Sequence, residues 1–149
     1  MTLPLIEVLA VLSATLFAGA AIYINVVEHP ARMGFSTQVA ATWWAPSYRR
    51  ATLMQAPLAI VGFALGVLAW AFGAGIPWLL GALLLGSVVP FTFLGLMPTN
   101  QQLLDERRDL SSDETRRLLT RWGNLHAIRS VASTAASLVF LVDLAVRTS

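Results

Sequence analysis

The sequence contains no cysteine and no lysine, and it has only two histidines and few charged residues. The lack of cysteine excludes structural disulfides, thiolate metal sites, iron–sulfur clusters and a cysteine nucleophile. Charged residues make up 12% of the 149 residues, which is about half of their share in ordinary soluble domains. Hydrophobic residues make up 56%, and the mean hydropathy is +0.68. This composition predicts an integral membrane protein.

The hydrophobic residues gather in four stretches, each long enough to cross a bilayer, which takes about 20 apolar residues. We expect an all-α, four-helix membrane bundle that forms one domain over residues 1–149. The predicted spans are residues 3–27, 51–72, 76–97 and 127–146. The cytoplasmic connection between spans three and four is expected to be helical as well. Thr99 would cap a run through Asp109, and the Ser111-Ser-Asp-Glu114 pattern would start a new helix at Ser111 or Ser112.

All ten basic residues are arginine, and nine of them lie in or next to the two long connections. Only Arg147 lies on the other side. The positive-inside rule therefore places both connections in the cytoplasm and both termini outside, with a bacterial inner membrane as the expected location. The chain has no basic soluble domain, so nucleic acid is not an expected partner. With only four spans, we expect a homo-oligomer or a complex with another membrane protein.

Two prolines interrupt the predicted spans at the same depth below the cytoplasmic edge. Pro57 lies in the second span and Pro90 in the third, and each frees a backbone carbonyl. Thr52, Gln55 and Thr92 lie in the same slab, so a widened cytoplasmic mouth is one interpretation. The other is that both prolines are simply tolerated, as prolines are in transmembrane helices.

The strongest candidate for a functional site is the entry to the fourth span. Trp122, His126 and Arg129 are spaced i, i+4 and i+7, which places them on one stripe of a helix. Histidine can act as a general base, arginine can stabilise an oxyanion, and tryptophan offers a flat stacking wall. Trp122 and Arg129 are also typical interfacial anchors. Ionisable residues that face a membrane bundle are costly, and we therefore expect the three together to be functional.

A second group of polar residues closes the first span. Asn25 and His29 are spaced i, i+4, and Pro30 is expected to end this helix at His29. His29 could serve as a second general base. Alternatively, Glu28, His29 and His126 could form a metal site with nitrogen and oxygen ligands. Their spacing matches no common metal motif, so a bound metal ion stays an alternative.

Asn100 follows the third span at the predicted level of both histidines. Its amide could orient substrate or an oxyanion, although asparagine after a proline is also a common turn residue or helix cap. Tyr48 and Arg50 lie at the entry to the second span, where they are membrane anchors unless one turns inward. At the opposite face, Asp143 is expected to pair with Arg147 at i+4.

Four short motifs follow one another along the chain: Tyr23…Glu28-His29-Pro30-Ala31, Trp44-x-x-x-Tyr48-x-Arg50-Ala51, Pro98-Thr99-Asn100 and Trp122-x-x-x-His126-x-x-Arg129. Their order and placement resemble the anthrone oxygenase-like family of small membrane proteins. Family members more often have asparagine directly after the tryptophan, where this chain has Gly123 followed by Asn124. Characterised relatives oxidise an anthrone to an anthraquinone with molecular oxygen and without an obvious organic cofactor.

The resemblance implies roles for the residues named above. His126 or His29 would be the base that removes the acidic ring proton, and Arg129 and Asn100 would stabilise the resulting enolate. The expected substrate contacts are Tyr23, Trp122 and Tyr48 as aromatic walls, with Arg50 and Asn25 beside them. O2 would be the co-substrate, no organic cofactor is expected, and a metal ion is possible.

The favoured prediction is therefore a membrane monooxygenase that oxidises a lipophilic aromatic or enolisable substrate. Deprotonation would give a carbanion or phenolate, which reduces O2 by itself or with a bound metal. Two alternatives remain open. The protein could bind or transport a small lipophilic molecule without transforming it, or it could be an accessory subunit of a membrane complex. A lipophilic small molecule and membrane lipid are the expected ligands.

Overall fold

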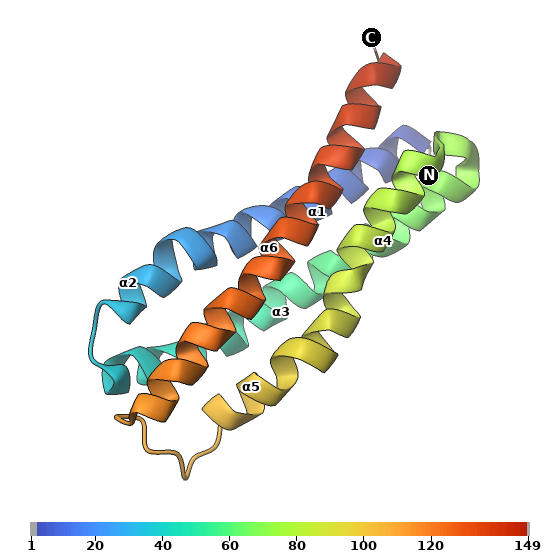
Figure 1. Ribbon diagram of the computed structural model, residues 1–149. Helices are drawn as coiled ribbons and strands as arrows, with labels where there is room; N and C mark the ends of the chain where they lie inside the picture. The colour runs from blue at the N-terminus through green and yellow to red at the C-terminus, as the bar shows by residue number, and fades with distance from the viewer. Residues whose placement is uncertain (1–2, 149) are drawn as a thin grey trace.

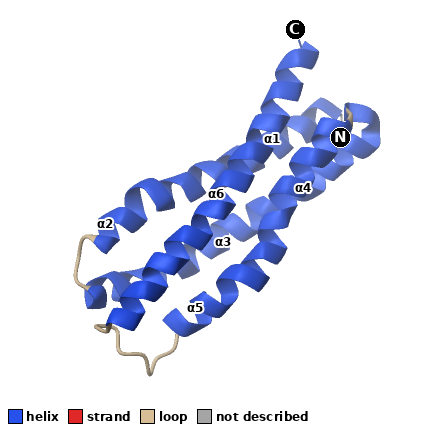
Figure 2. Ribbon diagram, in the orientation of Figure 1, coloured by secondary structure: helices blue, strands red, loops and turns tan. Residues whose placement is uncertain are grey.

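Four long helical rods run along the molecule and alternate in direction, as the computed structural model shows (Figure 1). The structure describes residues 3–148, so residues 1, 2 and 149 of the predicted domain lie outside it. The first rod consists of α1 (Leu3–Tyr23), a π-helical segment (Ile24–Glu28) and α2 (His29–Met33), and the second consists of α3 (Thr37–Ala69) and the π-helical segment Trp70–Ala74. The third rod consists of α4 (Ile76–Phe91), the π-helical segment Thr92–Leu96 and α5 (Met97–Leu103). The fourth rod is α6 (Asp113–Thr148). No strand occurs within residues 3–148 (Figure 2). The predicted all-α class is confirmed.

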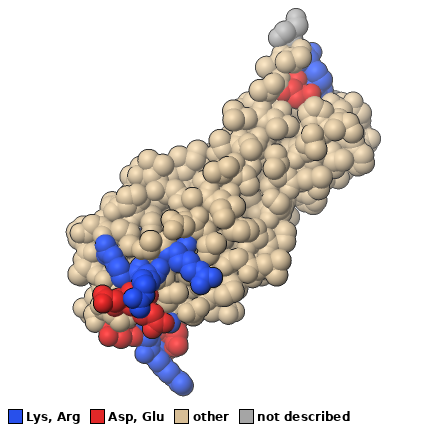
Figure 3. Space-filling view, viewed as in Figure 1, with Lys and Arg blue, Asp and Glu red and all other residues tan. Residues whose placement is uncertain are grey.

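The rods form a four-sided bundle. α1 packs against α3 and α6, and α4 packs against the same two helices from the opposite corner. Both ends of the chain lie at one end of the bundle, and the two long connections lie at the other (Figure 1). Charged side chains gather at the end with the connections and in a smaller group near the C-terminus, and the belt between them is free of charge in this view (Figure 3). Each rod is long and apolar enough to cross a membrane, so the protein is an integral membrane protein.

The prediction that Pro30 ends the first helix at His29 is wrong, because the helix continues to Met33. An α-helical proline clashes with the carbonyl four residues earlier and lacks an N–H to donate. Here a π-helical segment precedes the proline, and the amide of His29 donates to the carbonyl of Ile24, five residues back. This wider turn accommodates the ring. Pro98 is preceded in the same way by the segment Thr92–Leu96. Such π-helical turns are frequent at functional sites.

The third connection differs from the helical run that was expected between Thr99 and Asp109. α5 ends at Leu103, and residues 104–112 form a loop. The side chain of Asp105 accepts a hydrogen bond from the amide of Arg107 at 3.0 Å, and that of Asp109 accepts one from the amide of Ser111 at 2.8 Å. These aspartate turns compete with helix formation. The hydrogen bonds from Ser111 also hold the pKa of the Asp109 carboxyl below its usual value.

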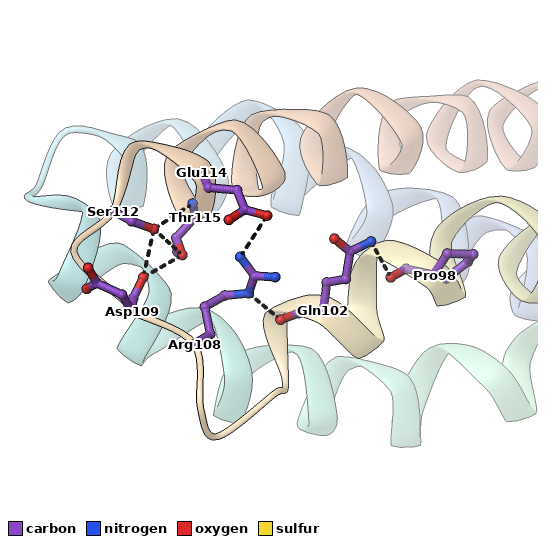
Figure 4. A network of polar contacts seen from close by, with 7 residues as sticks. All are labelled: Pro98, Gln102, Arg108, Asp109, Ser112, Glu114 and Thr115. Carbon is purple, nitrogen blue, oxygen red and sulfur yellow. Dashed lines mark hydrogen bonds and ion pairs between the residues drawn. The ribbon is translucent and has the colours of Figure 1, made fainter.

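A serine cap starts α6 where the sequence indicated, although with a different partner. The Ser112 Oγ accepts a hydrogen bond from the amide of Thr115 at 3.2 Å, and the Thr115 hydroxyl donates to the carbonyl of Asp109 at 2.7 Å (Figure 4). Glu114, which was expected to complete a capping box, instead pairs with Arg108 at 3.4 Å. Arg108 also donates to the carbonyl of Gln102, and these contacts tie the loop to both helices it joins (Figure 4).

Small residues allow a tight core in the half of the bundle that lies away from the connections. The Phe140 ring is fully buried and stacks on Trp78 with 4.9 Å between ring centroids. It packs on the backbone of Gly66 and Gly81: a Cβ added to Gly81 would lie 2.4 Å from the Cε1 of Phe140. Close approach through small side chains is the usual means of helix association in lipid.

We predict that Gly81→Ala destabilises the protein, whereas Gly19→Ala does not. Alanine is intrinsically the better helix former, but the Phe140 ring is held by Trp78 and cannot move away from the new methyl group. Overpacking of this kind costs about 1–3 kcal/mol. Nothing lies within 4 Å of a Cβ added at Gly19. Thermal unfolding in detergent measures the difference, and equal midpoints for both variants would contradict this account of the core.

Candidate functional site

The side chain of Asn25 joins the first rod to α6 through both ends of its amide. Its Nδ2 donates to the carbonyl of Gly123 at 3.0 Å. Its Oδ1 lies 2.7 Å from the Nδ1 of His126 and accepts a hydrogen bond from the Ser130 hydroxyl at 2.6 Å. A backbone carbonyl can only accept, so the orientation of the amide is fixed by Gly123.

This arrangement also fixes the tautomer of His126. Because the Oδ1 of Asn25 can only accept, the Nδ1 of His126 carries the proton. In the neutral ring the Nε2 then holds a lone pair, and no hydrogen bond from a described residue reaches it. The imidazole is 1% exposed. A neutral histidine that is oriented through Nδ1 and free at Nε2 has the form required of a general base.

His29 and His126 both pack against the Trp122 indole. The ring centroids of His29 and Trp122 are 5.3 Å apart, and those of Trp122 and His126 are 4.9 Å apart. The two histidines are thus held near each other by one aromatic ring. The contact also explains why Gly123 follows the tryptophan: a Cβ at this position would lie 2.5 Å from the Nε2 of His29. α6 runs through Gly123 unbroken.

Arg129 carries its charge into the bundle without a carboxylate partner. Its Nη2 donates to the Oε1 of Gln55 at 2.9 Å, and its guanidinium lies over the Phe17 ring at 5.4 Å. Within residues 3–148 the ion pairs are made by other arginines. The Nε of Arg129 and the Nε2 of Gln55 are buried donors without a hydrogen-bond partner there. Such a cation favours a ligand that brings a negative charge.

Tyr48 turns inward and does not act as a surface anchor. Its ring stacks on the buried Trp44 with 5.0 Å between centroids. Its hydroxyl accepts a hydrogen bond from the Nδ2 of Asn100 at 3.2 Å, and the Asn100 side chain is fully buried. Since the hydroxyl accepts from Asn100, its own proton remains available to a ligand oxygen.

Two cavities adjoin these groups. The larger has a volume of about 130 Å³ and lies between α3 and α4, at the place where a widened mouth was one of the two interpretations of the span prolines. Its lining includes Phe17, Tyr48, Thr52, Ala56, Ala59, Val89, Thr92 and Arg129. The smaller cavity, of about 10 Å³, is lined by His126 and Gln55 among others and shares Tyr48, Thr52 and Arg129 with the larger one. The two cavities therefore adjoin at these shared residues, and of the two His126 lines the smaller one.

Some predicted site residues do not belong to this cluster. Tyr23 is 56% exposed on the outside of the bundle, and Arg50 is exposed as well; neither lines either cavity. The proposed metal trio is not assembled either. The Glu28 carboxylate accepts hydrogen bonds from Arg32 and Ser47, and no group of three histidine or acidic side chains suited to a metal ion occurs among the described residues.

Sequence reasoning missed Ser130 and did not assign Gln55 to the site. Ser130 follows His126 by four residues, so the same helical spacing that grouped His126 with Trp122 also includes it. The sequence placed Gln55 at the level of the two span prolines, but it did not indicate Arg129 as its partner. A buried amide in a membrane helix nearly always has a partner, and here the partner is Arg129.

Comparison with known proteins assigns the family. The family model described as anthrone oxygenase matches residues 44–139. The chain belongs to the anthrone oxygenase family. Anthrone oxygenase tpcL of Aspergillus fumigatus is 39% identical over 72 residues, which cover 46% of this chain and 45% of that relative. The chain thus matches under half of the length of that relative. No solved structure matches.

Membership of the anthrone oxygenase family confirms the resemblance found in the motifs and suggests an oxygenase. The matched region contains Tyr48, Gln55, Asn100, His126 and Arg129. Asn25 and His29 lie before it, so their place in the site rests on the contacts described above.

We predict that Asn25 sets the tautomer of His126. In the wild-type protein, the His126 side chain is expected to carry its proton on Nδ1, and this preference should be lost in Asn25→Leu because no acceptor faces Nδ1. The ¹⁵N chemical shifts of labelled histidine report the tautomer directly. Asn124→Leu, which replaces an exposed asparagine on the same helix, serves as the control. A wild-type His126 protonated on Nε2 would refute the assignment.

Proposed function

We propose that this protein is a membrane monooxygenase that oxidises a lipophilic, enolisable aromatic compound of the anthrone type with O2. Family membership supports the oxygenase class. The observation that carries the proposal is the pairing of an oriented neutral histidine with a cation that has no carboxylate partner, at the edge of one cavity. A base and an anion-stabilising group are what the formation of an enolate requires.

The reaction converts a ring methylene into a carbonyl. The methylene carbon loses two hydrogen atoms and gains one oxygen atom from O2, and the second oxygen atom leaves as water. The Nε2 of His126 removes the first proton, and the pair of electrons left on the substrate is delocalised onto its carbonyl oxygen. The resulting enolate is electron-rich and reduces O2. His126, now protonated, can return its proton to the oxygen that leaves as water.

Arg129 and Tyr48 are the groups that would hold the enolate oxygen. Both line the larger cavity, Arg129 as a cation and Tyr48 as a hydroxyl donor. Gln55 orients the guanidinium through its Oε1, and Asn100 orients the hydroxyl through its Nδ2. Donors that are fixed before the reaction stabilise developing charge without having to reorganise. In this proposal Gln55 and Asn100 are positioning residues, and Asn25 positions the base.

His126 is the more suitable of the two candidate bases. His126 lines the smaller cavity, and Arg129 lines it as well. His29 lines neither cavity, and its Nε2 side packs against the backbone of Gly123. His29 is therefore proposed to hold the Trp122 indole against His126 and not to contact substrate.

The orientation in the membrane and the assembly also remain proposals. Nine of the ten arginines lie near the two long connections, so we place these connections in the cytoplasm and both termini outside. The proposed site then opens near the cytoplasmic side of the bilayer. A homo-oligomer or a membrane-protein partner is proposed because a four-helix bundle leaves many apolar side chains exposed, among them Leu53 and Leu94.

We predict that His126→Gln lowers the rate of oxygen uptake with anthrone by about 10²–10⁴-fold, the usual contribution of a general base. Glutamine retains a similar volume but cannot accept the proton. His29→Gln, the matched control, should reduce the rate much less. Uptake is followed with an oxygen electrode on protein purified in detergent, after subtraction of the spontaneous rate. Unchanged turnover in His126→Gln would remove the central claim, and binding of anthrone without uptake in the wild type would favour the binding-protein alternative.

We predict that Arg129→Gln lowers kcat by about 10²–10³-fold, as the loss of an oxyanion donor does. KM should change less, since the charge to be stabilised develops only after substrate is bound. Arg121→Gln removes an exposed arginine from the same helix and should leave kcat unchanged. Equal effects of both variants would show that Arg129 acts only through the overall charge of this face.

A further inference from the structure

The larger cavity is too small to enclose a multi-ring substrate. Its volume is about 130 Å³, whereas pockets that enclose small-molecule ligands typically measure about 300–1,000 Å³. A substrate that places its carbonyl oxygen beside Arg129 and Tyr48 must therefore extend out of the cavity. The direction of this extension is set by the rest of the cavity wall.

A groove of about 490 Å³ continues from the cavity along the seam between α3 and α4. The two share Ala59 and Val89. None of the residues that line the groove is charged, and they include Ile60, Phe63 and Leu83. The hydroxyl of Ser87 is satisfied within its own helix by the carbonyl of Leu84, at 2.7 Å. The groove thus offers a ligand apolar contact only, and its polar end is the cavity.

The groove faces the membrane and not the aqueous end of the bundle. It lies along residues 59–63 of α3 and 83–90 of α4, and its lining residues Ile60 and Leu83 are exposed. Phe63 packs on Gly86, where a Cβ would lie 2.6 Å from the Phe63 ring. The absence of a side chain at Gly86 makes room for the Phe63 ring, which forms part of the groove wall.

We propose that the lipophilic aromatic substrate enters the site sideways from the bilayer, through the α3–α4 seam, and binds with its carbonyl edge in the cavity and its outer rings in the groove. The nature of this ligand rests on the proposed function. The route itself rests on the continuity of groove and cavity. Small side chains along the seam, at Ala56, Ala59 and Ser87, then set the size of the substrate that can enter.

The test measures binding of anthrone in the absence of oxygen, by equilibrium dialysis against the full-length protein in lipid nanodiscs, with empty nanodiscs subtracted. Ala56→Trp fills the mouth of the cavity, and Ser87→Trp fills the groove. Ala64→Trp is the control, since Ala64 is an exposed alanine of α3 that lines neither. Each blocking variant should raise the Kd by about tenfold or more, because the tryptophan overlaps the bound ligand. A tenfold change corresponds to a loss of about 1.4 kcal/mol of binding free energy. The control should stay near the wild-type value.

The outcomes separate this proposal from the proposed function. A raised Kd in both blocking variants, without oxygen uptake by the wild type, supports the route and removes the oxygenase activity. Wild-type affinity in both blocking variants, or no binding by the wild type, overturns the route. It is also overturned if Ser87→Trp releases a phospholipid that the wild type retains on purification while the Kd for anthrone is unchanged, because the groove would then be a lipid site.

Discussion

The site depends on one side-chain amide that hydrogen-bonds to three residues of α6, which are Gly123, His126 and Ser130. Asn25 holds the carbonyl of Gly123 and the imidazole of His126, and it lies in the π-helical segment that Pro30 follows. In hydrocarbon, an unsatisfied polar group costs several kcal/mol. An amide at this depth therefore keeps its partners, and the distance between the two helices, the tautomer of His126 and the space beside it are fixed together.

Two further side-chain amides, those of Gln55 and Asn100, each orient a group that lines the cavity. Gln55 uses its oxygen on Arg129, and Asn100 uses its nitrogen on Tyr48. In both pairs the amide comes from one helix and the group that faces the cavity from another. The bundle thus supplies rigid donors without any carboxylate, and the local field is positive where an enolate oxygen would form. A carboxylate in this position would neutralise the cation and remove that effect.

Helical spacing predicted much of this site and could not predict the rest. It placed Trp122 and His126 on one stripe, and the two indeed pack together. The helix end expected at Pro30 was wrong, because a π-helical turn changes the hydrogen-bond register and no sequence pattern marks such a turn. Tyr23 and Arg50, which the resemblance suggested as substrate contacts, are exposed and line neither cavity. These helices are apolar on most sides, so no polar stripe marks which face is directed inward. The inward direction of Tyr48 follows from its stacking on Trp44, a contact between side chains that only the folded chain reveals.

Two arginines of α6, Arg147 and Arg129, have different surroundings: the first is paired with carboxylates and the second is not. Arg147 lies between Glu7 and Asp143, at 2.8 Å and 2.6 Å, and Trp78 completes the group by donating to Asp143. The predicted pair with Asp143 is thus confirmed, and Glu7 joins it. This cation is neutralised within the described residues and ties α6 to α1. Arg129 has an amide and an aromatic ring as its contacts. Removing a partner from a buried ion pair is strongly destabilising, so a bundle that keeps a cation without one needs another source of negative charge. At Arg129 the open cavity allows that charge to come from a ligand.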